Sequence, residues 1–162
     1  RIDSNRNINN FSRMYSIGSS QYYITSDNKL YVYGTNVCGR HGYGYKYINK
    51  SANLVENSFF NGEYIDVISE SRYSNHCIIC TNGELYGSGN NYDCQLSKKL
   101  ESRNLFMSTK ICDVETVFKS SIKQIETGKD HTIFLTGDGC IYGSGNNEYG
   151  QLSFDNKDIT YD

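Results

Sequence analysis

The chain has 162 residues, 37% of them hydrophobic, and a formal net charge of −2 at pH 7. That length allows one domain, and no apolar run approaches the roughly 20 residues that span a bilayer, so we expect no membrane role. Binding nucleic acid through phosphates needs clustered Lys and Arg, yet residues 110–162 hold five Lys against nine Asp and Glu. We therefore expect no direct nucleic-acid binding by this segment.

The first predicted element is a hairpin. Two apolar runs, residues 22–24 and 30–32, flank the turn residues Asp27-Asn28. The string Tyr33-Gly34-Thr35-Asn36 follows directly. After it, we expect the stretch 45–61 to contain an outer strand and variable loops.

A second hairpin is predicted within residues 76–96. Its runs, 78–80 and 85–86, are joined by Asn82-Gly83, a strong hairpin signal because these residues accept the positive φ of a primed turn. Gly87-Ser-Gly-Asn-Asn91 comes next. For the stretch 98–119 we again expect an outer strand and variable loops.

A third hairpin is predicted within residues 128–152. The runs 133–135 and 140–142 flank Gly137-Asp138-Gly139, and Gly143-Ser-Gly-Asn-Asn147 follows. The runs are apolar on consecutive residues, which suits strands buried on both faces. This pattern predicts small antiparallel sheets stacked on one another, with little helix.

The three segments are copies of one unit. Gly34, Gly89 and Gly145 lie 55 and 56 residues apart, and His76 and His131 lie 55 apart. A fixed period of this length indicates one supersecondary unit repeated in tandem, as in a propeller or a solenoid. The first copy has decayed most, because Gln21 stands where the others have His and Arg40-His41 replaces Gln-Leu.

The best copy is Gly128-Lys-Asp-His-Thr, an apolar run, and then Asp138-Gly-Cys-Ile-Tyr-Gly-Ser-Gly-Asn-Asn-Glu-Tyr-Gly-Gln-Leu152. This string resembles the repeat of the regulator of chromosome condensation family. The resemblance covers about three repeats, at approximately 8–44, 62–97 and 117–154 of a single segment, 1–162. In that family the repeats build a seven-bladed β-propeller of four-stranded blades. The implied fold is an all-β partial propeller of about three four-stranded blades.

Three repeats are too few to close a seven-bladed ring, and an open stack leaves sheet edges unpaired. We therefore expect the segment to be part of a larger propeller. The remaining blades would come from the same longer chain or from another chain.

Residues that recur at matching places are interpreted as scaffold, because a single binding site needs a group once whereas a repeat needs it in every unit. We expect the two recurring histidines to be buried and hydrogen-bonded to a neighbouring blade. The recurring glycines supply positive φ and room for close backbone approach. The predicted structural positions are His76, His131, Gly34, Gly89, Gly145, Asn91, Asn147, Gln95 and Gln151.

Six cysteines include Cys77 and Cys80, which have the spacing of a zinc knuckle. A knuckle turns both thiolates toward one ion, whereas residues three apart on a strand point to opposite faces. We interpret them as buried apolar side chains in a reduced, intracellular compartment, cytoplasmic or nuclear. A metal or disulfide role is the alternative. No cofactor, metal ligand or catalytic residue is assigned.

The resemblance implies a non-catalytic protein-interaction module. Two alternatives remain open: a guanine nucleotide exchange factor for a Ran-like small GTPase, and a propeller appended to a ubiquitin ligase or kinase. The expected partner is another protein, with a small GTPase as one candidate. Exchange factors of the family use acidic side chains in the loop before the His-Thr step, which corresponds here to Lys129-Asp130. Asn75 stands at the place of Asp130 in the second copy and Ser20 in the first, and a solvated turn is the alternative role for Asp130.

Overall fold

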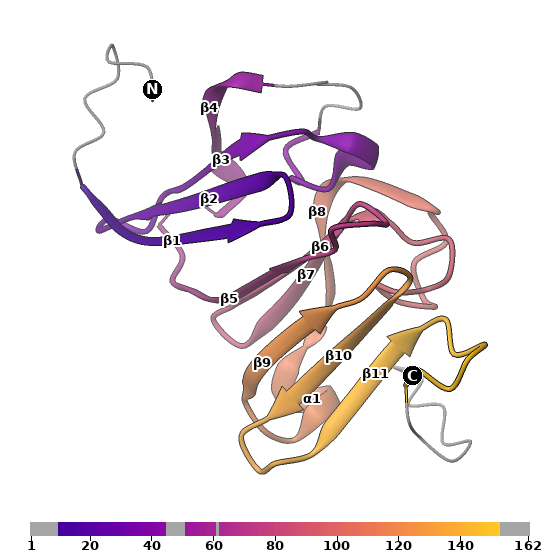
Figure 1. The fold of residues 1–162 in the computed structure, drawn as a ribbon. Helices are drawn as coiled ribbons and strands as arrows, with labels where there is room; N and C mark the ends of the chain where they lie inside the picture. Colours follow the sequence, from indigo (N-terminus) through magenta and orange to yellow (C-terminus); the bar gives the residue numbers. More distant parts are fainter. Residues whose placement is uncertain (1–9, 45–50, 61, 153–162) are drawn as a thin grey trace.

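The computed structural model describes residues 10–44, 51–60 and 62–152 (Figure 1). The outermost residues of the first and third expected repeats, 8–9 and 153–154, lie outside this part of the chain. Within it, the strands form three antiparallel sheets. The expected all-β fold of stacked small sheets is therefore confirmed.

The first two sheets each have four strands in sequence order. The first consists of β1 (Phe11–Ile17), β2 (Ser20–Thr25), β3 (Leu30–Gly34) and β4 (Ser51–Asn57). The second consists of β5 (Ile65–Glu70), β6 (His76–Thr81), β7 (Glu84–Asn90) and β8 (Asn104–Asp113).

The third sheet has three strands among the described residues, one fewer than the expected four. They are β9 (Ile122–Thr127), β10 (His131–Thr136) and β11 (Ile141–Gly145). Short helical turns connect the sheets and strands: η1 (Val37–Gly39), η2 (Ser58–Phe60) and α1 (Val114–Phe118).

The predicted hairpins lie where the sequence places them, but their second strands run further. β7 and β11 continue through the glycines that follow the apolar runs. Gly87 pairs with Ile78 on one side and with Thr109 on the other. A Cβ atom on Gly87 would lie 2.8 Å from Ile111 Cδ1 and 3.0 Å from Leu96 Cδ2, so the glycine leaves room for these side chains to pack over the strand.

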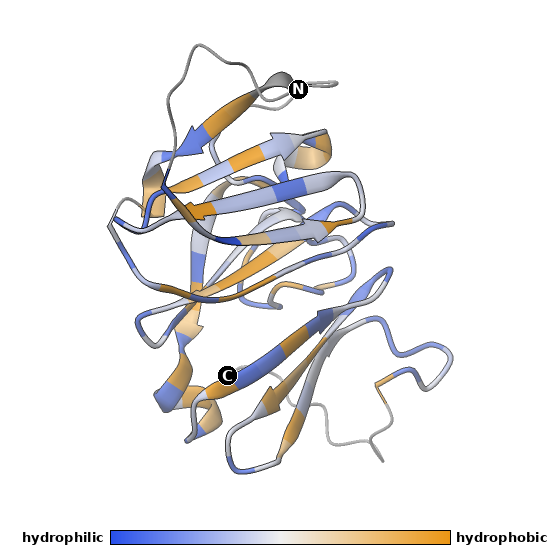
Figure 2. Ribbon diagram, turned by 60° about the vertical axis from the view of Figure 1, so that its left-hand side comes forward, coloured by the Kyte–Doolittle hydropathy of each residue, from blue (hydrophilic) through white to orange (hydrophobic). Residues whose placement is uncertain are grey.

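Strand β6 is buried on both faces, as its uninterrupted apolar run predicts. Cys77 and Ile79 pack toward the first sheet, and Ile78 and Cys80 pack toward the third. Two separate cores result, one at each contact between sheets. We call the contact of the first and second sheets the first joint, and that of the second and third sheets the second joint. Figure 2 shows hydrophobic segments in the strands of all three sheets, interspersed with hydrophilic ones.

The two ends of the sheets carry different connections. The loops that precede each second strand and follow each third strand lie at one end, which we call the loop face. The tight hairpin turns 26–29, 82–83 and 137–140 lie at the opposite end, which we call the turn end.

A repeated close approach of backbone shapes the loop face. Gly34, Gly89 and Gly145 all have positive φ, from +93° to +132°. A Cβ atom at these positions would lie 2.3, 2.1 and 2.4 Å from the carbonyl oxygens of the residues that precede the second strands, listed in order as Ser19, Asn75 and Asp130. Only glycine fits both the conformation and the space.

We predict that Gly89→Ala destabilises the protein by at least about 3 kcal/mol, because it adds a backbone clash to the cost of a positive φ. The matched control is Gly83→Ala at the turn end, where φ is +75° and nothing lies within 4 Å of the added Cβ. That change carries the conformational cost alone, about 1 kcal/mol. Urea denaturation of both variants measures the difference, and equal losses would contradict the close approach.

Candidate functional site

The loop after each third strand is closed by an asparagine side chain. Oδ1 of Asn36 accepts a hydrogen bond from the backbone N–H of His41, five residues on, at 2.9 Å. Asn91 and Asn147 make the same bond to the residues five positions later, at 3.0 and 2.9 Å. Arg40, Gln95 and Gln151 therefore occupy equivalent places.

These loops reach onto the next sheet. The hydroxyl of Ser88 donates to the carbonyl of Arg40 at 2.7 Å, and Ser144 donates to the carbonyl of Gln95 at 2.9 Å. Thr132 donates to the same Gln95 carbonyl at 2.9 Å. The side-chain oxygens of Gln95 and Gln151 accept N–H groups two residues earlier in their own loops. The loops of Arg40 and Gln95 thus each join one sheet to the next, and Gln151 is bonded within its own loop as Gln95 is.

His76 is fully buried in the second joint. One ring nitrogen lies 2.7 Å from Ser74 Oγ, and the other lies 3.3 Å from Thr132 Oγ1 of the third sheet. Burial, with a smaller contribution from the nearby His131, lowers the pKa of His76 to about 3. The imidazole is therefore neutral, and it is a structural contact. His131, at the equivalent place in the third sheet, is half-buried against Gly128.

The register of the first copy differs from the sequence-based alignment. Gly89 pairs with His76 and Gly145 with His131, whereas Gly34 pairs with Ser20. Ser20, not Gln21, is therefore the counterpart of the histidines. By the same register Ser19, not Ser20, corresponds to Asn75 and Asp130. The hairpin of the first sheet is one residue longer than that of the second. An alignment of these two copies without a gap therefore shifts the residues of β2 by one position.

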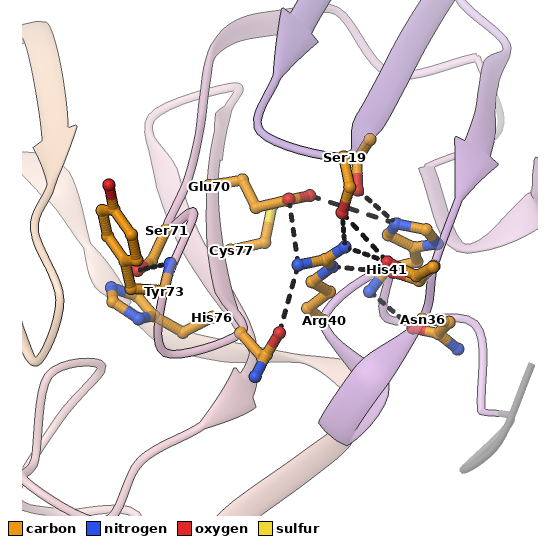
Figure 3. Close-up of polar contacts among 12 residues, drawn as sticks. Ser19, Asn36, Arg40, His41, Glu70, Ser71, Tyr73, His76 and Cys77 are labelled. Atoms are coloured by element: carbon orange, nitrogen blue, oxygen red, sulfur yellow. Dashed lines mark hydrogen bonds and ion pairs between the residues drawn. The ribbon is translucent and has the colours of Figure 1, made fainter. Parts of the chain in front are cut away.

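The first joint contains a buried arginine. Arg40 is 2% exposed, and its Nη1 lies 3.5 Å from Oε1 of the buried Glu70 (Figure 3). Its guanidinium also donates to the Ser19 hydroxyl at 2.6 Å, to the Thr35 carbonyl at 2.8 Å and to Asn75 Oδ1 at 3.1 Å. These bonds match the donors of Arg40 to acceptors from both sheets.

Glu70 is only partly compensated: among the described residues its buried Oε1 accepts no hydrogen bond, and Arg40 Nη1 lies 3.5 Å away. The Tyr22 hydroxyl donates to Oε2, and His41 Nε2 lies 4.0 Å from that oxygen. Burial raises the pKa of Glu70, and the Arg40 guanidinium opposes this rise. Burial lowers the pKa of His41 to about 3, with a further contribution from Arg40. His41 is thus neutral and bonded to Ser20 Oγ at 2.8 Å.

A hollow opens on the loop face where the inner strands of all three sheets end. Its volume is about 580 Å³. It is lined by residues 16–18 at the end of β1, by residues 68–70, 72 and 73 at the end of β5 and in the loop after it, and by residues 125–129 at the end of β9 and in the loop after it. The hollow is the place where side chains from every sheet converge on one accessible surface.

The predicted residues Lys129 and Asp130 lie in the loop between β9 and β10. Lys129 lines the hollow and its side chain is 74% exposed, whereas that of Asp130 is 23% exposed. Their charged groups lie 3.5 Å apart. The Asp130 carbonyl accepts the backbone N–H of Asn146, so its backbone belongs to the scaffold even though its side chain reaches the surface.

Sequence reasoning missed Arg72 and Tyr73. Both line the hollow, and Tyr73 is 71% exposed, with Arg72 Cζ 5.9 Å from its ring centroid. The loop between β5 and β6 is longer than its counterpart in the third sheet, which accommodates this pair. Its extra length relative to the third copy was the available signal.

Cys77 and Cys80 belong to different cores and point to opposite faces of β6. Burial raises the pKa of both thiols, that of Cys80 to about 12. Within residues 10–44, 51–60 and 62–152, no group of three or more His, Cys, Asp or Glu side chains is placed to hold a metal ion. In the same ranges, no helix has the length and apolar character needed to cross a membrane.

Comparisons with known proteins agree with this architecture. A sequence model described as Regulator of chromosome condensation (RCC1) repeat matches residues 122–151. The human X-linked retinitis pigmentosa GTPase regulator is 31% identical over 137 residues, which cover 82% of this chain and 12% of that protein. The mouse protein of the same name is 28% identical over 139 residues. The chain thus spans only about an eighth of the curated relatives it matches.

Solved propellers have the same fold. Yeast RCC1 (Prp20), in its complex with Kap60, superposes with a TM-score of 0.72 at 19% identity, over 91% of this chain and 34% of that one. Prp20p from Saccharomyces cerevisiae, described with its binding to Gsp1p and histones, gives 0.70 at 19% identity, over 86% and 34%.

Stacked antiparallel sheets, joined through a repeated Asn-closed loop, define a segment of a β-propeller. Its units are repeats of the regulator of chromosome condensation type, as the match at residues 122–151 and the similarity to the GTPase regulator show.

The two neutral, buried histidines predict acid sensitivity. The unfolded chain binds protons at His41 and His76 below about pH 6.5, whereas the folded chain does not until about pH 3. The free energy of unfolding should therefore fall on acidification below pH 6.5, by about 1.4 kcal/mol per pH unit for each histidine. Glu70, whose pKa is raised, acts in the opposite direction.

Urea denaturation at pH 7, 6 and 5 measures this slope in the wild type and in His76→Gln. The variant keeps Glu70 and His41, so the difference between the two slopes isolates His76. We expect the variant to lose less stability over this range. Parallel slopes would mean that His76 is protonated in the folded protein.

Proposed function

We propose that the chain is the partner-binding part of a non-catalytic propeller and that it binds another protein through the hollow on its loop face. The observation that carries the proposal is that this hollow, about 580 Å³, is lined by all three sheets. Loops held by a rigid scaffold are the usual place of binding function.

The chemistry at the rim suits a protein partner. Tyr and Arg are enriched among the residues that carry most of the binding energy in protein interfaces. Arg72 and Tyr73 stand together at the rim, with Lys129 from the neighbouring sheet. Glu126 adds an exposed acid to the lining, so the surface carries both signs of charge. Such a mixed surface favours a protein over a polyanion.

The first test places a photo-crosslinking residue at Tyr73 in the full-length protein. The matched control is Tyr64, which is 54% exposed, lies at the turn end and also has an arginine beside it, with Arg13 Cζ 4.6 Å from its ring. We expect a discrete adduct with a partner protein from position 73, none from position 64, and at least about tenfold less adduct when Arg72→Ala is added. Equal labelling from both positions would exclude the hollow as the binding surface.

A second candidate function is guanine nucleotide exchange on a small GTPase. It is supported by the similarity to proteins named GTPase regulators and by Lys129, which lines the hollow and whose Nζ lies 3.5 Å from the Asp130 carboxylate. An exchange factor needs no covalent chemistry, since it stabilises the nucleotide-free state of the GTPase. A carboxylate such as that of Asp130 would act by competing for the groups that hold magnesium and phosphate.

Release of a fluorescent nucleotide from Ran-like GTPases tests this second function. We expect the full-length protein to accelerate release and Asp130→Asn to reduce the acceleration by about tenfold or more. Asp138→Asn, which changes an acidic residue in a turn at the other end of the third sheet, is the control and should have no effect. The absence of acceleration with every Ran-like GTPase would exclude exchange and leave the interaction proposal standing.

A further inference from the structure

The loop that carries Arg72 and Tyr73 is fixed at both of its ends by neighbouring sheets. At its start, Ser71 Oγ donates to the carbonyl of Gly128 in the third sheet at 2.6 Å. At its end, the side-chain oxygen of Asn75 accepts a hydrogen bond from Arg40 of the first sheet at 3.1 Å. The exposed pair at the rim of the hollow is thus held between two anchors.

Arg40 is a rigid anchor because its other contacts leave it little freedom. It is buried, and its guanidinium is bonded to Thr35 and Ser19 of its own sheet and paired with Glu70 of the next (Figure 3). The planar guanidinium reaches several acceptors at once in a fixed geometry. A movement of Asn75 away from Arg40 would leave a donor of this buried cation without its acceptor.

The second joint lacks this arrangement. Gln95 occupies the place of Arg40, and Thr127 occupies the place of Glu70. Among the described residues, Nε2 of Gln95 is a buried atom without a hydrogen-bond partner. The first joint therefore holds a charged pair, whereas the residues at the matching places of the second joint are neutral.

We propose that Arg40 is a positioning residue for the partner-binding loop. Held in the first joint by Glu70, it fixes Asn75 and thereby sets Arg72 and Tyr73 at the mouth of the hollow. The proposal rests on the proposed binding function for its purpose, but the order of the loop can be measured without any partner.

The direct test is Asn75→Gly in the full-length protein. Asn75 has φ of 58°, which glycine adopts freely, so the change removes the acceptor of Arg40 and leaves the Arg40–Glu70 pair in place. Asn28→Gly is the matched control, with φ of 60° in a hairpin turn at the turn end. We expect amide hydrogen exchange in residues 72–75 to rise about fivefold to tenfold in Asn75→Gly only, the equivalent of one hydrogen bond.

A second pair of variants separates positioning from stability. Arg40→Gln alone leaves the buried Glu70 without its cation and should lower the denaturation midpoint strongly. Arg40→Gln with Glu70→Thr copies the neutral residues of the second joint and should recover most of that midpoint. Exchange in residues 72–75 should stay about fivefold to tenfold faster than in the wild type even in the recovered double variant, because the bond to Asn75 is still missing.

Wild-type exchange rates in residues 72–75 of Asn75→Gly, or of the recovered double variant, would overturn the positioning role. Crosslinking from position 73 then tells the two proposals apart. Faster exchange together with weaker crosslinking supports both. Faster exchange in a protein whose wild type forms no adduct at position 73 supports positioning and removes the proposed binding function.

Discussion

The whole arrangement depends on one close approach of backbone to backbone. In every sheet a glycine of the third strand lies against the carbonyl oxygen that precedes the second strand. In the second and third sheets, that carbonyl also accepts the N–H of the residue after the glycine. Beyond this contact the loop is closed by asparagine and, after β3 and β7, accepts a hydrogen bond from a hydroxyl group of the next sheet. Without this contact, each sheet would still form, but the position of one sheet relative to the next would not be fixed.

The two joints solve the same packing problem with different chemistry. Both bury apolar side chains and both use a serine hydroxyl on a loop carbonyl. Among the residues that the structure describes, a buried ion pair, Arg40 with Glu70, is found at the first joint and not at the second. Desolvating two charges can cost as much as their attraction returns, so the pair is weak evidence of added stability. Its distinguishing effect is on the position of the two side chains. Separating them would leave a charged group without its partner in this core, which costs far more free energy than separating two neutral groups.

The sequence predicts those features that the backbone itself imposes. The Gly and Asn positions were predictable from the sequence because few residue types fit them. A backbone with positive φ favours glycine, and a loop closed by a side-chain amide favours asparagine. The consecutive apolar residues of β6 likewise predicted burial on both faces. The first copy was placed one residue out of register because it was compared with the second copy, whose hairpin is one residue shorter. The first hairpin has the length of the third, in which His131 faces Gly145 as Ser20 faces Gly34. The predicted strands were too short. Glycine-rich residues that suggested a loop are paired with β6 and belong to β7.

The candidate site was less predictable, for a physical reason. The third copy has Thr127 at the place of Glu70, so repetition does not point to an acid there, and Glu70 meets Arg40 only once the sheets stack. The arginine at a Gln position was nevertheless a sign that a buried partner was needed. Arg72 and Tyr73 lie in a loop whose extra length breaks the repeat, and the hollow itself is a property of three strands from distant parts of the sequence. Residues that recur in every copy therefore identify the scaffold, whereas residues that differ between copies identify the candidate binding surface.

The open space around Gly83 and Gly139 has a consequence for how such a protein can grow. Neither residue has a neighbouring atom within reach of an added side chain, and both lie at the end of the molecule away from the hollow. Lengthening a surface connection costs chain entropy only slowly, as the logarithm of its length. The Gly83 carbonyl accepts the N–H of Val114, so an insertion there would disturb the start of α1, whereas the Gly139 N–H is bonded within its own hairpin turn, to the Thr136 carbonyl. The Gly139 tip is therefore the place where added residues would disturb the stacking of the sheets least.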